Sequence, residues 1–452
     1  MRTGCGARYR PPDRIRFRRA EPSLTADRSM TRPTHRAEIA GRPLTVLDKG
    51  IPSAPPGATI GTIGELGWSV PDLLPPVAVL RESAIEHNIE IMAGYCQQHG
   101  FELAPHAKTT MAPALVDRQL AHGAWGMTVG TAFQARVLAG LGVHRIIIAH
   151  QVHDRVGIAE VARLLVEHPD LEVHVLADSL QGVALMDAAL SALEPPRPLH
   201  VLVELGMTGG RTGARTVEAA LDVARAVGRA PTLRFAGVEG YEGLAERGEL
   251  DSTLRAVDRF LDEMVRLTEA VERERLVDGA MILSAGGSAY FDRVVDRFGT
   301  IGPEVARILR SGCYVTHDHS KYRRLSPLDG RAPSSPSLRA ALEVWCAVVS
   351  RPERDLVVVN GGRRDMSFDA GLPLAFAMWR DDAGAVEFED WWPVERMMDQ
   401  HAMIRIPADA EVGPGDLIAL GISHPCTTFD KWRVMPVVDD RHRVVDAVVT
   451  HF

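Results

Sequence analysis

The chain has 452 residues and a formal net charge of −8, with 46% hydrophobic and 24% charged residues. At roughly 100–200 residues per domain, this length predicts two or three globular domains, and the composition excludes a disordered, collagen-like or coiled-coil chain. The mild acidity argues against a nucleic-acid-binding protein, which usually presents a basic face.

The cysteine content and the N-terminal segment both bear on the location of the protein in the cell. Five widely spaced cysteines favour a reducing compartment over a disulfide scaffold, and no apolar run is long enough to span a membrane, so we expect a cytoplasmic protein. Residues 1–39 are rich in Arg and Pro and lack the apolar core of a secretory signal, which predicts a disordered extension. Residues 40–76, with several Gly and Pro, are expected to form an irregular arm.

From residue 77 to about 325, short apolar runs alternate with amphipathic helical patterns. The expected strands are residues 77–80, 102–107, 126–129, 145–149, 171–177, 199–205, 233–238 and 280–284. The longest helical pattern covers residues 250–275. Near-continuous apolar strands separated by helices are typical of parallel β-structure, and eight of them predict a TIM-like (β/α)8 barrel, with a doubly wound open sheet as the alternative.

After about residue 326 the helical periodicity ends. Extended apolar runs at 342–349, 356–360, 401–406, 417–422 and 433–438 are separated by turn-forming segments. We therefore expect residues 326–452 to form a smaller, mainly antiparallel β domain.

Lysine is scarce in this chain, which narrows the search for lysine chemistry. Of the 51 Lys and Arg residues only four are lysines, namely Lys49, Lys108, Lys321 and Lys431. Composition bias explains this scarcity. Lys108 follows an expected strand in the segment APHAKTTM, residues 104–111, close to His106. At the carboxyl end of a barrel strand a partly desolvated lysine can act as nucleophile or base, whereas the alternative is a solvated rim lysine.

Three further strand ends carry residues suited to an anionic ligand. Gly286, Gly287 and Ser288 follow the last expected strand, where small residues let backbone N–H groups approach a phosphate, although ordinary turns use the same residues. Arg211 and Tyr241 follow two preceding strands and could contact an anionic or aromatic ligand, or serve as a surface arginine and a packing tyrosine.

The segment SHPCTTFD, residues 423–430, contains a His-x-Cys pair. In an extended segment His424 and Cys426 would point to the same side, and imidazole plus thiolate suits zinc. Two ligands do not complete a site, and a purely structural pair is the alternative.

Together these segments resemble the D-serine dehydratase / D-threonine aldolase family, which has the alanine-racemase-like fold (fold type III) of pyridoxal-phosphate enzymes. The resemblance covers about residues 75–450 and depends on five segments: 105–109, 240–243, 286–288, 311–318 and 424–426. Segment 311–318 reads SGCYVTHD and is similar to the family's Pro-Gly-x-Tyr-x-x-x-Asp strand, with Ser311 replacing proline. The resemblance implies that residues 77–80 could belong to the β domain and residues 314–316 to a late barrel strand.

The resemblance implies a role for each candidate residue. Lys108 would anchor pyridoxal 5'-phosphate, with the remaining cofactor contacts made by His106, Arg211, Tyr241, Gly286, Gly287 and Ser288, and a metal held by His424 and Cys426. In this family His-x-Cys goes with the zinc-dependent dehydratases and His-x-Asp with the aldolases. We therefore expect a lyase that converts D-serine, or a related β-hydroxy-D-amino acid, to a 2-oxo acid and ammonia, and that forms a homodimer.

Two alternatives remain at this point. Thr110 and Met111 stand where family members commonly have His-Lys, which leaves substrate choice open. The first alternative is a D-threonine aldolase that uses Mn²⁺ or Mg²⁺. The second is a non-catalytic pyridoxal-phosphate carrier, although such carriers lack the second domain expected here.

Overall fold

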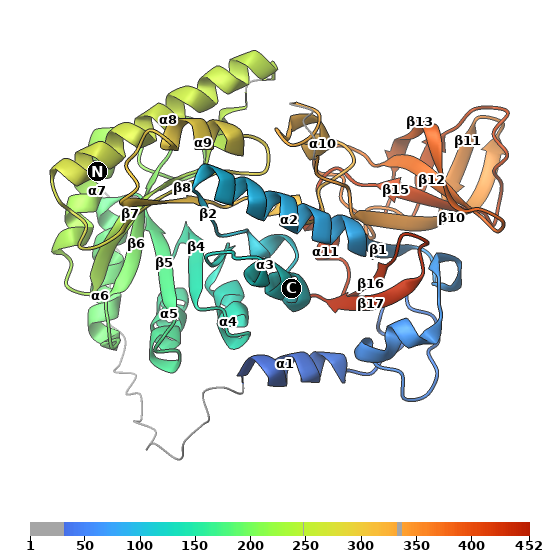
Figure 1. Cartoon of the computed structure of the whole chain (residues 1–452), viewed down its shortest axis with the longest axis horizontal. Helices are drawn as coiled ribbons and strands as arrows, with labels where there is room; N and C mark the ends of the chain where they lie inside the picture. Colours follow the sequence, from blue (N-terminus) through green and yellow to red (C-terminus); the bar gives the residue numbers. More distant parts are fainter. Residues whose placement is uncertain (1–30, 247, 332–336) are drawn as a thin grey trace, which may run out of the picture.

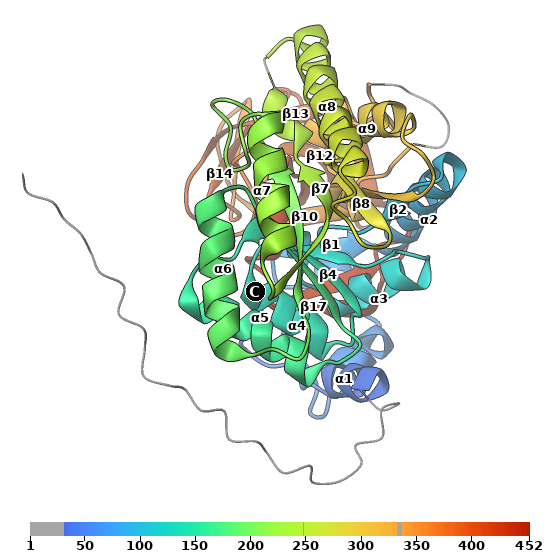
Figure 2. The same cartoon turned by 90° about the vertical axis from the view of Figure 1, so that its left-hand side faces the viewer.

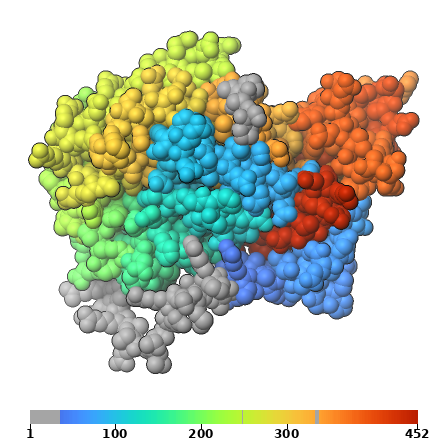
Figure 3. Space-filling view, in the orientation of Figure 1, coloured from blue at the N-terminus to red at the C-terminus, as the bar shows by residue number. Residues whose placement is uncertain are grey.

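The computed structural model describes residues 31–246, 248–331 and 337–452. Within these residues the chain forms an eight-stranded parallel sheet and a nine-stranded, largely antiparallel sheet, which lie side by side in Figure 1. Figure 3 shows the surface of helix α2 (Glu82–His99), in light blue, between the barrel and the β domain.

The parallel sheet is a closed barrel. Its strands are β2 (Glu102–Leu103), β3 (Met127–Val129), β4 (Arg145–Gln151), β5 (Glu172–Ala177), β6 (Leu199–Leu205), β7 (Leu233–Gly240), β8 (Met281–Ala285) and β9 (Val305–Leu309). β9 pairs with β2, and the Trp125 and Thr128 N–H groups donate to the carbonyls of Leu103 and Pro105, both at 2.8 Å. These bonds join β2 to β3 and complete the ring, so the predicted (β/α)8 architecture is confirmed.

Helices cover the outer face of this barrel (Figure 2). They are α2, α3 (Pro113–Ala121), α4 (Ala132–Gly140), α5 (Arg155–Glu167), α6 (Leu180–Leu193), α7 (Val217–Arg229), α8 (Leu250–Arg273) and α9 (Phe291–Phe298). Four successive helices, α4 to α7, begin at residues whose side-chain oxygen accepts an N–H three residues later: Thr131, Asp154, Ser179 and Thr216. These N-caps satisfy backbone donors that the first helical turn leaves unpaired, which explains why each helix begins where it does.

The interior of the barrel is filled by small and branched side chains. One buried cluster takes a residue from nearly every strand: Ala104, Ile147, Leu176, Leu202, Ala236, Ile282 and Ile308. The barrel is therefore a packed core, and polar chemistry is confined to the ends of its strands.

The second sheet forms the β domain. Its strands are β1 (Val77–Arg81), β10 (Leu342–Glu353), β11 (Leu356–Val359), β12 (Leu374–Arg380), β13 (Gly384–Met397), β14 (Ala402–Arg405), β15 (Leu417–Gly421), β16 (Val434–Val438) and β17 (Val444–Val449). β1 pairs antiparallel with β10 and parallel with β16, so residues 77–80 lie in this sheet and do not form the first barrel strand.

The arm before β1 packs on one face of the β domain. Ile60 and Ile63, in the 3₁₀ helix Ile60–Leu66, share a buried cluster with Val79 and Trp345 of the sheet. Helix α1 (Thr31–Ala40) precedes this arm and overlaps the segment 1–39 for which we expected disorder, whereas residues 1–30 lie outside the described residues.

One expected strand is wrong. Residues 314–316 belong to no strand, because Cys313–Val315 form a 3₁₀ helix after β9. The eighth barrel strand is β9 itself, whose sequence VARIL places an arginine inside an otherwise apolar run and so obscures the pattern. The remaining short helices are α10 (Lys321–Leu325) and α11 (Cys426–Phe429). No helix in the described ranges is long and apolar enough to cross a membrane.

Candidate active site

Lys108 stands at the mouth of the barrel, where the carboxyl ends of the strands meet. It lies in the 3₁₀ helix Ala107–Thr109, which follows β2. Lys108 is exposed, and within the part of the chain that the structure describes its amine makes no hydrogen bond or ion pair. A free primary amine in a barrel mouth is available for covalent chemistry.

The surroundings of Lys108 favour its neutral form. Partial removal of water lowers its pKa first, and the positive charges of Arg211 and Arg310 lower it further, while the thiols of Cys426 and Cys313 oppose the shift. A lysine with a lowered pKa is a better nucleophile and proton acceptor near neutral pH.

The residues that follow neighbouring strands contact one another around the mouth. The Arg211 guanidinium lies over the Tyr241 ring, 5.6 Å from its centre, and burial raises the pKa of the tyrosine. A Cβ placed on Gly287 would approach Cε2 of Tyr241 to 2.8 Å, so the Gly-Gly loop and the tyrosine lie in direct contact. Ser288 Oγ accepts the N–H of Cys313 at 3.2 Å.

The predicted phosphate loop has a partner that sequence reasoning missed. The N–H groups of Gly286 and Gly287 donate to the buried carboxylate of Glu242 at 3.0 and 2.6 Å. Burial raises the pKa of Glu242, and these two backbone donors oppose the rise. A phosphate must therefore compete with Glu242 for these donors or bind beside them, at Ser288 and the start of α9.

Several buried polar atoms at the mouth lack partners. His106 Nδ1, Arg310 Nε and one carboxylate oxygen of Glu239 are buried without a hydrogen bond among the described residues. Burial lowers the pKa of His106, as do the charges of Lys108 and Arg310, so its imidazole is neutral. Unsatisfied buried polar atoms are uncommon in folded proteins and are typical of sites that receive a ligand.

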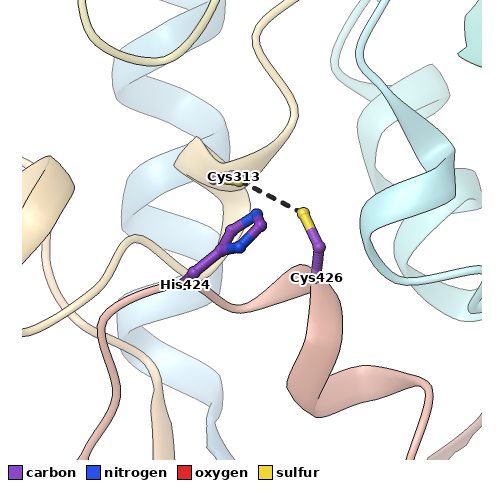
Figure 4. A group of neighbouring side chains, drawn as sticks. All are labelled: Cys313, His424 and Cys426. Carbon is purple, nitrogen blue, oxygen red and sulfur yellow. Dashed lines mark hydrogen bonds between the residues drawn. The ribbon is translucent and has the colours of Figure 1, made fainter. Parts of the chain in front are cut away.

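The predicted metal pair lies beside this mouth with a third potential ligand. His424 lies in the loop before α11, and Cys426 is the first residue of α11. Cys313 begins the 3₁₀ helix that follows β9. Figure 4 shows the imidazole of His424 beside the side chain of Cys426, with a dashed line that joins Cys426 to Cys313. The two Sγ atoms are 3.6 Å apart, and one ligand atom from each residue lies within 4.8 Å of the others.

The cluster is pre-oriented by the protein. The Nδ1–H of His424 donates to Asp369 at 2.6 Å, which leaves Nε2 for the thiols, and Asp369 also accepts from Thr427 at 2.9 Å. Burial opposes protonation of His424, but hydrogen bonds to Cys426 and Asp369 raise its pKa to about 9. The hydrogen bond from Cys313 and the nearby imidazolium hold the pKa of Cys426 well below its ordinary value, so one thiolate is already present.

The two parts of the site touch at Thr109. Cys426 Sγ and Thr109 Oγ1 are hydrogen-bonded at 3.4 Å, and Thr109 is the neighbour of Lys108 in the chain. A metal at the cysteines would therefore lie next to the position of the lysine amine.

Sequence reasoning named the residues on the local motifs and missed those that packing adds. Cys313 was part of the quoted segment 311–318, and a thiol next to a glycine there was the available signal. Glu242 lies in segment 240–243, one of the five on which the resemblance depends, whereas nothing in the sequence pointed to Asp369 or Arg310.

Comparisons with known proteins agree with this geometry. Residues 80–299 match the family described as alanine racemase, N-terminal domain, and residues 341–438 match the putative serine dehydratase domain. A 3-hydroxy-D-aspartate aldolase of Paracoccus denitrificans is 26% identical over 364 residues, which cover 78% of this chain and 89% of that protein.

Solved structures share the whole architecture. D-threonine aldolase from Filomicrobium marinum superposes with a TM-score of 0.70 at 23% identity, over 85% of this chain and 97% of that one. D-threo-3-hydroxyaspartate dehydratase from Delftia sp. HT23 gives 0.68 at 18% identity, over 85% and 99%. Two further solved structures are variants of a D-threo-3-hydroxyaspartate dehydratase. One replaces a histidine, and the other replaces a cysteine two positions later and is described as metal-free.

Proposed function

Because this chain belongs to the D-serine dehydratase / D-threonine aldolase family, with its alanine-racemase-like fold, we propose that it is a zinc-dependent pyridoxal-phosphate lyase that dehydrates and deaminates D-serine or a related β-hydroxy-D-amino acid. The observation that carries the proposal is the contact between Cys426 and Thr109, since it sets a metal-binding cluster beside the only lysine at the barrel mouth in the described structure.

The residues at the mouth fit pyridoxal phosphate. An unpaired amine is available at Lys108, and the guanidinium of Arg211 offers a positive charge beside the Tyr241 ring. Ser288 and the first N–H groups of α9 suit a phosphate, and Gly287 leaves open a space that a Cβ would fill. The buried nitrogens His106 Nδ1 and Arg310 Nε have no hydrogen-bond partner among the described residues, so a bound ligand could supply one.

The chain's own groups supply the proton transfers and the positioning. Bound pyridoxal phosphate supplies an electron sink for charge developing at the substrate Cα, and bound zinc supplies a Lewis acid. Lys108 Nζ, with its lowered pKa, takes the proton from Cα. His424 and Cys426 hold the metal where the substrate's β-hydroxyl would lie, and Asp369 fixes the imidazole that faces it.

The His-x-Cys spacing supports dehydration. In the dehydratase relatives, the variants at a histidine and a cysteine two positions apart indicate the same spacing that His424 and Cys426 have here. A metal held by His424 and Cys426 would supply Lewis-acid stabilisation of the leaving hydroxide, so the expected products are a 2-oxo acid and ammonia.

A second candidate is a retro-aldol cleavage, favoured by the 3-hydroxy-D-aspartate aldolase relative. In that reaction a base removes the proton of the β-hydroxyl, and the Cα–Cβ bond breaks to give glycine and an aldehyde. The carrier alternative has no such support, because the β domain and its cysteine-histidine cluster are present.

One substrate separates the two reactions. We expect D-threonine to give 2-oxobutyrate and ammonia, D-serine to give pyruvate and ammonia, and the L-enantiomers to give neither. Glycine and acetaldehyde from D-threonine would instead identify an aldolase. These substrates are tested with zinc and again after chelation, and Lys108→Ala is the inactive control. A protein that converts no β-hydroxy-D-amino acid under either condition would refute the proposal.

A further inference from the structure

We propose that Cys313 is a third protein ligand, so that the chain holds zinc between two thiolates and one imidazole and leaves a single coordination position for the substrate. The inference rests on the proposed function in one respect, namely that a metal binds at this cluster. It deepens that proposal by fixing the metal class and the way in which the substrate's hydroxyl binds.

The distance between the two sulfurs fits a shared metal. In a tetrahedral site with Zn–S bonds of about 2.3 Å, two thiolates lie about 3.8 Å apart. Cys313 Sγ and Cys426 Sγ are separated by 3.6 Å, far more than the ~2.05 Å of a disulfide. Because His424 Nδ1 is bound to Asp369, Nε2 is the imidazole atom free to complete a three-ligand face.

Cys313 is held in place by the packing around the lysine segment. It is 5% exposed, and its N–H is fixed by Ser288 Oγ. A Cβ at the preceding Gly312 would approach Cβ of His106 to 2.6 Å and Thr109 Oγ1 to 2.8 Å, so only glycine allows the close approach of these two backbones. The thiol of Cys313 is therefore set beside Cys426 by the same contacts that position Lys108.

Three protein ligands are the usual complement of a catalytic zinc ion, which keeps its fourth position for water or substrate. Two thiolates neutralise the charge of the ion and form a soft donor set, which suits zinc, cadmium or cobalt and disfavours Mg²⁺ and Mn²⁺. One open position admits one oxygen atom, so the β-hydroxyl binds alone and the substrate does not chelate the metal through its carboxylate.

The two halves of this site come from different domains. Cys313 follows barrel strand β9, whereas His424 and Cys426 belong to the β domain. A metal bound by all three would therefore also hold the barrel and the β domain together, and we expect its binding to raise the melting temperature.

The test is the cobalt-substituted full-length protein. Charge transfer from thiolate to Co²⁺ absorbs in the near ultraviolet in proportion to the number of bound thiolates. We expect Cys313→Ser to lose about half of this absorbance and at least ~10-fold in zinc affinity, measured by competition with a chromogenic chelator. Cys96→Ala, at a buried cysteine of α2 outside the cluster, is the matched control and should change neither quantity.

A parallel variant separates failure of this inference from failure of the proposed function. If Cys426→Ser loses the band while Cys313→Ser keeps the full band and affinity, Cys313 is not a ligand although the proposed metal site stands. If the wild-type chain binds neither cobalt nor zinc, the metal site itself is refuted.

A measurement without variants covers the case in which Cys313→Ser does not fold. X-ray absorption at the zinc edge of the wild-type protein should count two sulfurs at about 2.3 Å and two lighter atoms. A count of one sulfur would overturn the inference.

Discussion

Two glutamates, each 2% exposed, show how differently the barrel mouth and the β domain treat a buried charge. In the β domain, Glu343 accepts hydrogen bonds from Arg81, Trp345 and His442 at 2.9 to 3.2 Å. Burial alone would raise its pKa, but these partners lower it to about 2. At the mouth, Glu239 has Arg310 as its ion-pair partner and one oxygen without a hydrogen bond, and burial raises its pKa to about 7.

The difference between the pairing of Glu343 and that of Glu239 indicates where a ligand is expected to bind. A buried carboxylate whose two oxygens both have partners, as in Glu343, contributes to stability, whereas unpaired polar atoms inside a folded protein are tolerated where a ligand completes them. By this criterion we expect the carboxylate of Glu343 to be structural and a ligand to bind beside Lys108, His106 and Arg310.

Replacing Lys108 at the barrel mouth should lower turnover more than any other substitution considered. Lys108→Ala should reduce turnover by about 10³-fold or more, because the cofactor anchor and the proton acceptor are lost together. Since the amine has no partner in the described structure, the melting temperature of the cofactor-free protein should not fall. The measurements are steady-state turnover, the cofactor's visible absorbance and calorimetry, and turnover and colour that both survive would show that another group anchors the cofactor.

Loss of the paired carboxylate of Glu343 should have the opposite effect. Glu343→Gln should cost ~3 kcal/mol of unfolding free energy at pH 7, because Arg81 and His442 lose their buried charged partner, with little effect on turnover per folded molecule. Because the folded pKa lies below the unfolded value near 4.5, this contribution is present above pH 4.5 and disappears as the pH falls toward 2. Urea melts of both proteins across that range test the sign, and a difference that grew on acidification would contradict it.

The phosphate loop offers a smaller and more specific perturbation. A Cβ at Gly287 would meet Tyr241 at 2.8 Å and Glu242 at 3.2 Å, so Gly287→Ala should weaken cofactor binding ~10-fold through the displaced contacts. Gly94→Ala is the matched control, since on α2 its Cβ would have nothing within 4 Å. Titration of the cofactor-free proteins measures both affinities, and equal affinities would place the phosphate elsewhere.

The smallest effect on turnover concerns the lysine that anchors the arm. Lys49 lies 2.6 Å from the buried carboxylate of Asp365 and 3.9 Å from the centre of the Trp432 ring. When the lysine is removed, Asp365 Oδ2 still accepts a hydrogen bond from the Gly362 N–H at 2.8 Å. Lys49→Gln leaves Asp365 Oδ1 buried without its ion-pair partner and should cost ~2 kcal/mol of stability, whereas turnover and cofactor absorbance should stay at wild-type values.

The sequence by itself determined the elements and motifs whose signals are local. The alternation of apolar strands with amphipathic helical patterns indicated the barrel, and the scarcity of lysine left Lys108 as the lysine at a strand end. The His-x-Cys spacing indicated a metal pair, because two residues two positions apart need only a short segment to face the same side.

Only the tertiary structure decided which distant groups complete the site. Cys313 reaches Cys426, 113 positions later in the chain, because the end of β9 packs against the loop before α11, and no short-range pattern encodes that contact. The same holds for β1, whose apolar run fits either sheet until its partners β10 and β16 select one. It also holds for Glu242, since its carboxylate meets the Gly286 and Gly287 N–H groups only when neighbouring barrel strands align their ends.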